Sequence, residues 1–313
     1  MHKNTFPLTY SQVPIDQAKS ALQKSIRRGV LWDTIQWTVE IFNTSTVEQY
    51  KAVRTNLFNR LLVIAVEDVS PSHIEAILMV WRLIKDHKDD QLNYVTTAAY
   101  LCQCKKSRVN DWAVHYFSEE QLADFVNFAD PEKIGLDFKQ ALINKDYILA
   151  LWLFSGLRVC VNNISGYKYN KALFMVWVAL QQLYPDNTYL QELKEIALST
   201  GWRWQDKSYL IYVHIIHVIC KNILPDNDRS VKINLVAQPN LELENFISMV
   251  LNRQNYVNIP DYAIDMHTHA GRQMRRGICH FVKTSVVLEN EDPDWLELSN
   301  FYLAKFKADR DIY

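Results

Sequence analysis

The amino-acid sequence predicts an all-α protein, a multi-helix bundle with at most a minor strand element. The chain has 313 residues and only 7 glycines, far fewer than the average usage of roughly 7% would give. Tight turns, phosphate loops and bulged strands use glycine at positive φ, so few of these features are expected. Hydrophobic residues make up 49% and aromatic residues 12% of the chain, and apolar residues recur at the three- and four-residue steps that are typical of helices.

The spacing of apolar residues predicts the helices of the first half. They are expected over 16–29, 31–42 and 57–69, then from a Ser70-Pro71-Ser72 break to Ile84, then over 92–104 and around Trp112 and Tyr116. A proline in a first turn is compatible with the restarted helix. Glu67 and Asp68 stand just before the break, where carboxylates are expected to cap a helix rather than to serve in acid–base catalysis.

The second half also shows helical spacing of apolar residues, but its last 57 residues differ in composition. Helices are expected over 138–145, 147–160, 169–183, 190–199, 208–223 and 244–251, with the best strand-like stretch around 231–236. A segment rich in His and Arg begins near residue 259, and an acidic run follows over 289–297. We therefore predict a first helical domain over 1–125, a second over 126–256, and a C-terminal segment over 257–313.

The two helical domains show partial matches when the chain is shifted on itself by 116–120 residues. The matched positions are Ala21-Leu22 with Ala141-Leu142, Leu31-Trp32 with Leu151-Trp152, Leu57-Phe58 with Leu173-Phe174, Tyr94-Val95 with Tyr212-Val213, and Cys102 with Cys220. These matches predict a duplicated helical unit. Chance agreement among apolar helices is the alternative.

Composition excludes several classes of function. No glycine pair forms a phosphate-binding loop or a dinucleotide-binding fingerprint, so we expect no nucleotide cofactor, no other cofactor and no ATPase activity from this chain. The five cysteines form no CxxC pair, which is typical of buried thiols in a reducing compartment. No apolar stretch reaches the roughly 18–20 residues of a membrane span, and the N-terminus lacks a signal-peptide core. The sequence thus predicts a soluble intracellular protein, in cytoplasm or nucleus, with no membrane partner.

Three stretches of the first half resemble one protein family in order and spacing. They are SALQKSIRRG (20–29) with Trp32 and Trp37 after it, RLLVIAVEDVSPSHIEAI (60–77), and AAYLCQCKKSRVNDWA (98–113). Together they resemble the C-terminal helical region of the MgsA-type replication-associated recombination ATPases, relatives of the AAA+ clamp loaders. The resemblance covers about residues 16–117, and the ATPase domain itself is absent.

The resemblance implies a collar-like role rather than a catalytic one. In that family this helical region supports oligomerisation behind the ATPase, near DNA, so the expected partners are a clamp-loader-like ATPase or further copies of this chain. The segment DMHTHAGRQMRRGICHF (265–281) also resembles a tail motif D-x-H-T-x-x-G-R-x-x-G-R of large-DNA-virus relatives. Arg275 stands where that motif has its second glycine.

A basic series in the C-terminal segment is the candidate nucleic-acid-binding site. A helix starting at Thr268 would align Arg272, Arg276 and His280 on one face, with Met274, Ile278 and Phe281 packed inward. Such a ridge suits phosphate oxygens. The acidic residues Glu289–Asp294 could neutralise it instead. The complete candidate set is Arg272, Arg275, Arg276, His280, Lys283, Lys105, Lys106 and Arg108.

Two alternatives come from other classes of function. Asp265-x-His267-x-His269 has the ligand spacing of a metal-dependent hydrolase, although few further ligands follow it, and His214 and His217 are expected to be packed in a helix. A protein-interaction scaffold without nucleic-acid contact is the other alternative. The main prediction is a non-catalytic helical scaffold or DNA-associated module in replication, recombination or repair, with no metal site.

Overall fold

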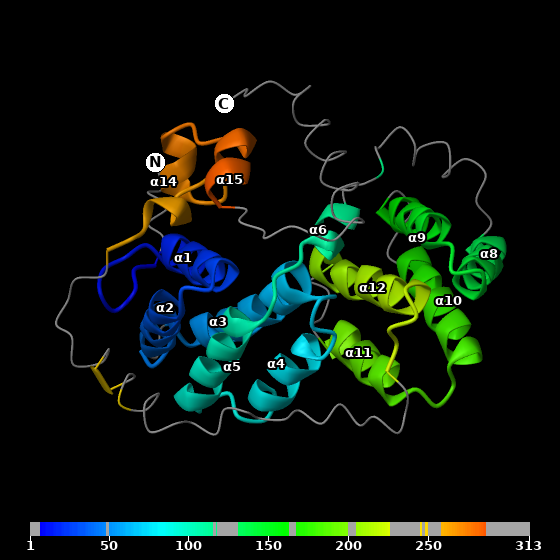
Figure 1. The fold of residues 1–313 in the computed structure, drawn as a ribbon, viewed down its shortest axis with the longest axis horizontal. Coiled ribbons are helices and arrows are strands. Elements are labelled where there is room, and N and C mark those ends of the chain that lie inside the picture. The colour runs from blue at the N-terminus through cyan, green and yellow to red at the C-terminus, as the bar shows by residue number, and fades with distance from the viewer. Residues whose placement is uncertain are drawn as a thin grey trace. The chain divides into compact units, whose positions relative to one another are not determined.

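A computed structural model gives the fold of the chain (Figure 1). The described residues are 7–47, 50–114, 117, 131–162, 167–199, 205–225, 245, 248–249 and 258–285. Regular structure among them is helical, and β pairing there is confined to an isolated bridge between Leu8 and Pro14. The predicted all-α class is confirmed. The expected strand at 231–236, the acidic run at 289–297 and Tyr116 lie outside the described residues.

The chain divides into two compact units. Unit 1 holds the described residues up to Arg108 together with those from Asn245 onward, and unit 2 holds those from Val109 to Pro225. The C-terminal segment 258–285 is therefore part of the same compact unit as the first helices. The predicted domain boundaries after residues 125 and 256 stay predictions.

Unit 1 is built from helices, of which those over 15–28, 31–44 and 91–103 follow the predicted positions closely, whereas the helix predicted over 57–69 begins six residues earlier. The helices of this unit are α1 (Ile15–Arg28), α2 (Leu31–Thr44), α3 (Lys51–Ile64) with the π-helical turn η2 (Ala65–Val69), α4 (Ala76–Ile84), α5 (Gln91–Gln103), η4 (Asp261–Ala263), α14 (His269–Gln273) and α15 (Ile278–Thr284). Helix α1 packs against α2 and α5, and α2 packs against α3 and α5. The core between α2 and α5 contains Ile35, Val39 and Val95.

Local sequence explains where α1 begins and ends. It follows Pro14, and Asp16 lies in its first turn, where the positive end of the helix dipole stabilises a carboxylate. It ends at Gly29, whose φ of 69° is a left-handed conformation that glycine adopts without strain. Arg27 and Arg28 occupy the last turn. The helix expected directly after the Ser70-Pro71 break begins later than predicted, at Ala76.

Unit 2 has the same style of construction around an aromatic core. Its helices are α6 (Val109–Val114), α8 (Pro131–Ile143), α9 (Tyr147–Asn162), α10 (Tyr167–Leu183), α11 (Thr188–Ser199) and α12 (Gln205–Cys220). The Phe154 ring stacks on Tyr209 with centroids 4.8 Å apart. Trp177 Nε1 donates a hydrogen bond of 2.8 Å to the Tyr212 hydroxyl.

Most of the helix contacts of unit 1 recur in unit 2. Helix α1 contacts α2, α3 and α5, and α8 correspondingly contacts α9, α10 and α12. The contacts of α2 with α3 and α5 recur as those of α9 with α10 and α12, and the contact of α4 with α5 recurs as that of α11 with α12. The five helices α1–α5 and the five helices α8–α12 therefore follow the same order along the chain and share most of their packing partners.

The turns after α1 and α8 match atom for atom. Gly29 N bonds to Ile26 O, and Lys145 N bonds to Leu142 O, 116 residues later. The bond from Val30 N to Ser25 O recurs between Asp146 N and Ala141 O. This offset pairs Ser25-Ile26, not Ala21-Leu22, with Ala141-Leu142.

The burial of the other matched residues varies along the chain. Tyr94, Val95 and Cys102 are buried in α5, as Tyr212, Val213 and Cys220 are in α12. Phe58 is buried whereas Phe174 is exposed. The match is therefore strongest for the turn after α1 and for α5.

Two expectations from composition concern the cysteines and the membrane. Cys102, Cys104 and Cys220 are buried thiols without a disulfide, and burial raises the pKa of Cys220 to about 11. Within the described part of the chain, every helix is too short or too polar to span a bilayer.

Acid is expected to destabilise unit 2 through His214. This side chain is fully buried in α12, and its Nε2 lies 2.7 Å from the Tyr189 hydroxyl. Burial, followed by the charge of His217, lowers the pKa of His214 to about 3. Below about pH 6.5 the unfolded chain takes up a proton that the folded chain does not, so the free energy of unfolding falls as pH falls, by about 1.4 kcal/mol per pH unit.

Urea unfolding at several pH values between about 6.5 and 5 measures this slope, because most carboxylates stay ionised in that window. We expect His214→Gln to flatten the slope, whereas His87→Gln, at an exposed position, leaves it unchanged. Identical slopes for the parent and His214→Gln would contradict the assignment.

Candidate nucleic-acid interface

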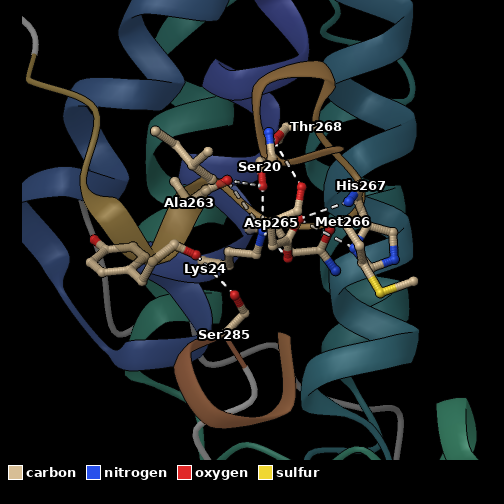
Figure 2. Close-up of polar contacts among 12 residues, drawn as sticks. Ser20, Lys24, Ala263, Asp265, Met266, His267, Thr268 and Ser285 are labelled. Carbon is tan, nitrogen blue, oxygen red and sulfur yellow. Dashed lines mark hydrogen bonds and ion pairs between the residues drawn. The ribbon is translucent and has the colours of Figure 1, made fainter. Parts of the chain in front are cut away.

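The C-terminal segment 258–285 lies along α1, held by a buried ion pair (Figure 2). Lys24 Nζ is 2.5 Å from an Asp265 carboxylate oxygen, and the two side chains are 4% and 0% exposed. Ser20, one helical turn before Lys24, donates a hydrogen bond of 2.7 Å to the Ala263 carbonyl. Figure 2 shows these groups converging from α1 and from the turn after η4. Helix α1 therefore supplies the polar face on which the segment folds.

The ion pair changes the protonation of both partners. Burial lowers the pKa of Lys24 to about 8, although Asp265 opposes this shift. Burial alone would raise the pKa of Asp265, but the contacts with His267 and Lys24 hold it well below its usual range. At neutral pH the pair is thus a carboxylate and an ammonium ion, enclosed together.

The turn Asp265–Gly271 explains the motif that the sequence contains. Asp265 Oδ1 accepts from the backbone N–H of His267 at 3.0 Å, and Thr268 Oγ1 accepts from Gly271 N at 3.0 Å as the N-cap of α14. A Cβ on Gly271 would stand 1.8 Å from the Asp265 carbonyl oxygen, so only glycine fits. The Asp, Thr and Gly of this motif have structural roles in building the turn.

A second buried carboxylate, Asp68, joins α1 to the turn after α5. Its Oδ1 accepts from Arg27 Nε at 2.9 Å and from Arg108 Nη1 at 2.6 Å. Its Oδ2 accepts from Gln23 Nε2 at 2.8 Å. Asp68 therefore neutralises two guanidinium groups, and the expected helix-capping role is replaced by an internal ion cluster. We call Asp68, Arg27, Arg108 and Gln23 the Asp68 cluster.

Phe281 connects the C-terminal segment to the Asp68 cluster. The Arg27 and Arg108 guanidinium carbons lie 5.7 and 5.9 Å from the centroid of its ring. The His267 ring meets it edge-on, with centroids 4.9 Å apart. Phe281 is buried, as the sequence predicted, whereas Met274 is 57% exposed and does not pack inward.

The C-terminal end of α1 also binds the end of α15. Arg27 Nη1 donates to the Ser285 carbonyl at 2.7 Å, and Arg28 donates to the Thr284 carbonyl. The Arg28 guanidinium lies 4.4 Å from the centroid of the Tyr262 ring. Burial raises the pKa of Tyr262 to about 12, and its hydroxyl donates to Asp33 at 2.9 Å.

The predicted ridge on the C-terminal segment is divided between two helices. Thr268 does cap a helix, but α14 ends at Gln273 and α15 starts at Ile278, so Arg272, Arg276 and His280 do not share one helical face. The reason is Arg275, which has a left-handed φ of 54° at the position where the tail motif has glycine. The prediction of one continuous helical face carrying these three side chains is therefore wrong.

The individual residues of this ridge have different environments. Arg272 and Arg275 are exposed, and Arg272 donates to the carbonyls of Met266 and His267. Arg276 is paired with Asp261 at 2.6 Å and bonded to the Ile264 carbonyl at 2.8 Å, so it serves the fold. His280 is half-buried beside Thr284, and Lys283 is exposed.

The turn after α5 supplies the remaining candidates. Lys105 is exposed. Lys106 Nζ donates to the Cys102 carbonyl at 2.8 Å and to the Cys104 carbonyl, which caps α5. Arg108 is buried in the Asp68 cluster and is bound to Glu67 at 3.3 Å as well. The exposed cations of the candidate set are thus Lys105, Arg272, Arg275 and Lys283.

The described residues do not provide the metal ligands that the hydrolase alternative requires. The Asp265 carboxylate is enclosed by Lys24, and the exposed His269 ring bonds to Gln273 at 2.9 Å. In the part of the chain that the structure describes, no group of three or more His, Cys, Asp or Glu side chains is placed to hold a metal ion.

Sequence reasoning missed the residues that build this site. It interpreted Lys24, Arg27 and Arg28 as helix-end cations, and it did not pair Lys24 with Asp265, which is 241 positions away in the chain. The signal that could have found the turn is the Asp265–Gly271 motif itself. Comparisons of the chain with protein-family models, curated proteins and solved structures gave no match.

Two glycine-related substitutions test the turn. Gly271→Ala is expected to destabilise the protein by about 1–3 kcal/mol or more, because the added Cβ collides with the Asp265 carbonyl. Arg275→Gly is expected to be neutral or slightly stabilising. Glycine removes the strain of about 1 kcal/mol that a left-handed φ causes in arginine, but it also increases the conformational entropy of the unfolded chain. Urea unfolding and amide exchange across 258–285 measure both changes. A Gly271→Ala variant as stable as the parent would refute the packed turn.

Proposed function

We propose that this chain is a non-catalytic helical module that binds nucleic-acid phosphates through unit 1 and supports complex assembly in DNA replication, recombination or repair. One observation carries the proposal. The basic turn after α5 and the end of the C-terminal segment lie together at the end of α1, although more than 170 residues separate Lys105 from Lys283 in the chain.

Contacts between three helix ends support this convergence. Arg28 at the end of α1 binds the Thr284 carbonyl at the end of α15. A Cβ on Gly29 would lie 3.7 Å from the Cys102 carbonyl near the end of α5. Arg108 faces the Phe281 ring of α15. The ends of α1, α5 and α15 are therefore neighbours.

Exposed cations at these ends and elsewhere in the C-terminal segment supply the phosphate-binding groups. Lys105 and Lys283 extend from the ends of α5 and α15, and Arg272 and Arg275 belong to the same C-terminal segment. No carboxylate among the described residues pairs with these four side chains. Because the net charge of the chain is -1, binding would depend on this local patch and on counterion release. We call these four residues the cationic patch.

The internal ion pairs favour a rigid presentation of the cationic patch. The Lys24–Asp265 pair and the Asp68 cluster neutralise the buried cations, leaving only the exposed ones for a ligand. The role in assembly, with a clamp-loader-like ATPase or further copies of the chain as partners, rests on the resemblance of residues 16–117 to MgsA-type collars.

A protein-interaction scaffold is the second candidate, favoured by unit 2. Leu136 on α8 and Phe174 on α10 are 65% and 64% exposed. They are adjacent in sequence to Gly135 and Met175, where these two helices touch. Large exposed apolar side chains on neighbouring helices are typical of interaction surfaces.

Salt-dependent DNA binding tests the proposal. The parent protein is expected to bind DNA weakly, with little sequence preference and a steep salt dependence. Lys105→Gln with Lys283→Gln is expected to lower the log–log salt slope by about 0.7–0.9 for each lost phosphate contact. Fluorescence anisotropy with single- and double-stranded DNA at several salt concentrations measures the slope.

The matched control replaces two exposed lysines of unit 2, Lys133→Gln with Lys221→Gln, and should leave the slope unchanged. Both double variants carry the same net charge. Equal slopes for the two double variants would remove the cationic patch as the binding site, and an absence of DNA binding by the parent would favour the interaction scaffold.

A further inference from the structure

Unit 2 contains a pocket of about 460 Å³ at the ends of three helices. Lys145 follows α8, Tyr184 follows α10, and Ile219 lies in the last turn of α12. Asp186, Asn187 and Asn222 line the same pocket. A volume of this size suits a small organic molecule or the end of a peptide. We call this cavity the Lys145 pocket.

The Lys145 ammonium group is the charged centre of this pocket. Its Nζ donates to the Ile219 carbonyl at 2.9 Å and lies 3.5 Å from the Tyr184 hydroxyl oxygen. Both partners are neutral, and no carboxylate among the described residues forms an ion pair with it. An ammonium group has three donors, and a tyrosine hydroxyl that accepts from it keeps its own proton to donate. The pair can therefore present two donors to one ligand group.

The counterpart of this pocket in unit 1 contains a carboxylate. The offset of 116 residues that aligns the turns places Lys145 at the position of Gly29, and Tyr184 at the position of Asp68. In unit 1 the Asp68 carboxylate binds Arg27 and Arg108 and is fully buried. In unit 2 a cation is present at the equivalent helix ends, but the carboxylate is replaced by a phenol.

We propose that the two units are copies of one five-helix motif, and that the Lys145 pocket binds the carboxylate of a small organic ligand where unit 1 has its own Asp68 carboxylate. Lys145 and the Tyr184 hydroxyl donate to the ligand's carboxylate. Asp186, which is exposed at the pocket, favours a ligand whose other end carries an amino group and disfavours a polyanion. The ligand's carboxylate is either that of a free amino acid, whose ammonium group would face Asp186, or the C-terminus of a peptide, whose last backbone N–H would donate to Asp186.

NMR titration of the full chain with named probes tests this proposal. Glycine is expected to shift the backbone signals of Lys145 and Tyr184 saturably in the millimolar range, acetate more weakly, and inorganic phosphate least. Two further probes distinguish the sources of the carboxylate: a tripeptide with a free C-terminus and the same peptide amidated. Binding of the free-ended peptide but not the amidated one identifies a peptide terminus as an occupant, and binding of glycine alone identifies a free molecule.

The variants are chosen to fit the backbone of the pocket. Lys145 has a left-handed φ of 57°, so Lys145→Asn and Lys145→Gly keep a residue that tolerates this conformation while removing the ammonium group. Both are expected to weaken glycine binding by about tenfold or more. Tyr184→Phe should weaken it severalfold, and Lys139→Gln, on α8 outside the pocket, should not change it.

Three results would overturn the proposal. They are saturation by inorganic phosphate at the same concentration as by glycine, an unchanged affinity in both Lys145 variants, and no saturable shift at Lys145 or Tyr184 with any probe. Circular dichroism of each variant confirms that its helices are intact. Since Lys145→Gly and Lys145→Asn affect the fold in different ways, a shared loss of binding is assigned to the ammonium group.

Discussion

The buried ion pair between Lys24 and Asp265 is the interaction on which the architecture of unit 1 depends. It lies between the first helix and a segment more than 230 residues later, and both of its charges are removed from water. Enclosing two charges costs several kcal/mol per ion, and this cost is offset only when each charge has its partner. The docking of the segment 258–285 on α1 is thus specific, because a displaced segment would leave Lys24 buried without a counter-ion.

The Asp68 cluster applies the same principle, pairing of buried charges, at the C-terminal end of α1. Asp68 holds Arg27 and Arg108 together, and Phe281 packs against both guanidinium groups. This arrangement brings the ends of α1, α5 and α15 into contact and leaves Lys105 and Lys283 exposed beside them. The internal charges build the scaffold, and the external charges form the cationic patch that we propose for phosphate binding.

Periodicity predicted the long helices well, since an apolar stripe at three- and four-residue steps determines them locally. The end of α1 at Gly29 could be predicted for the same reason. The partners of Lys24, Arg27 and Arg108 could not, because an ion pair between distant segments leaves no local pattern. The prediction of a continuous helix across 268–283 is wrong at Arg275. This residue has a left-handed conformation, which an arginine does not favour by itself, so the local sequence pattern did not indicate the break.

A double-mutant cycle on Lys24→Gln and Asp265→Asn tests the central claim most directly, through the free energies of unfolding in urea. Each single substitution leaves a buried charge without its partner and is expected to cost about 3–5 kcal/mol. The double variant should cost far less than the two costs added together, because it contains no unpaired charge. Additive costs, or single costs below about 0.5 kcal/mol as for an ordinary surface site, would contradict the account.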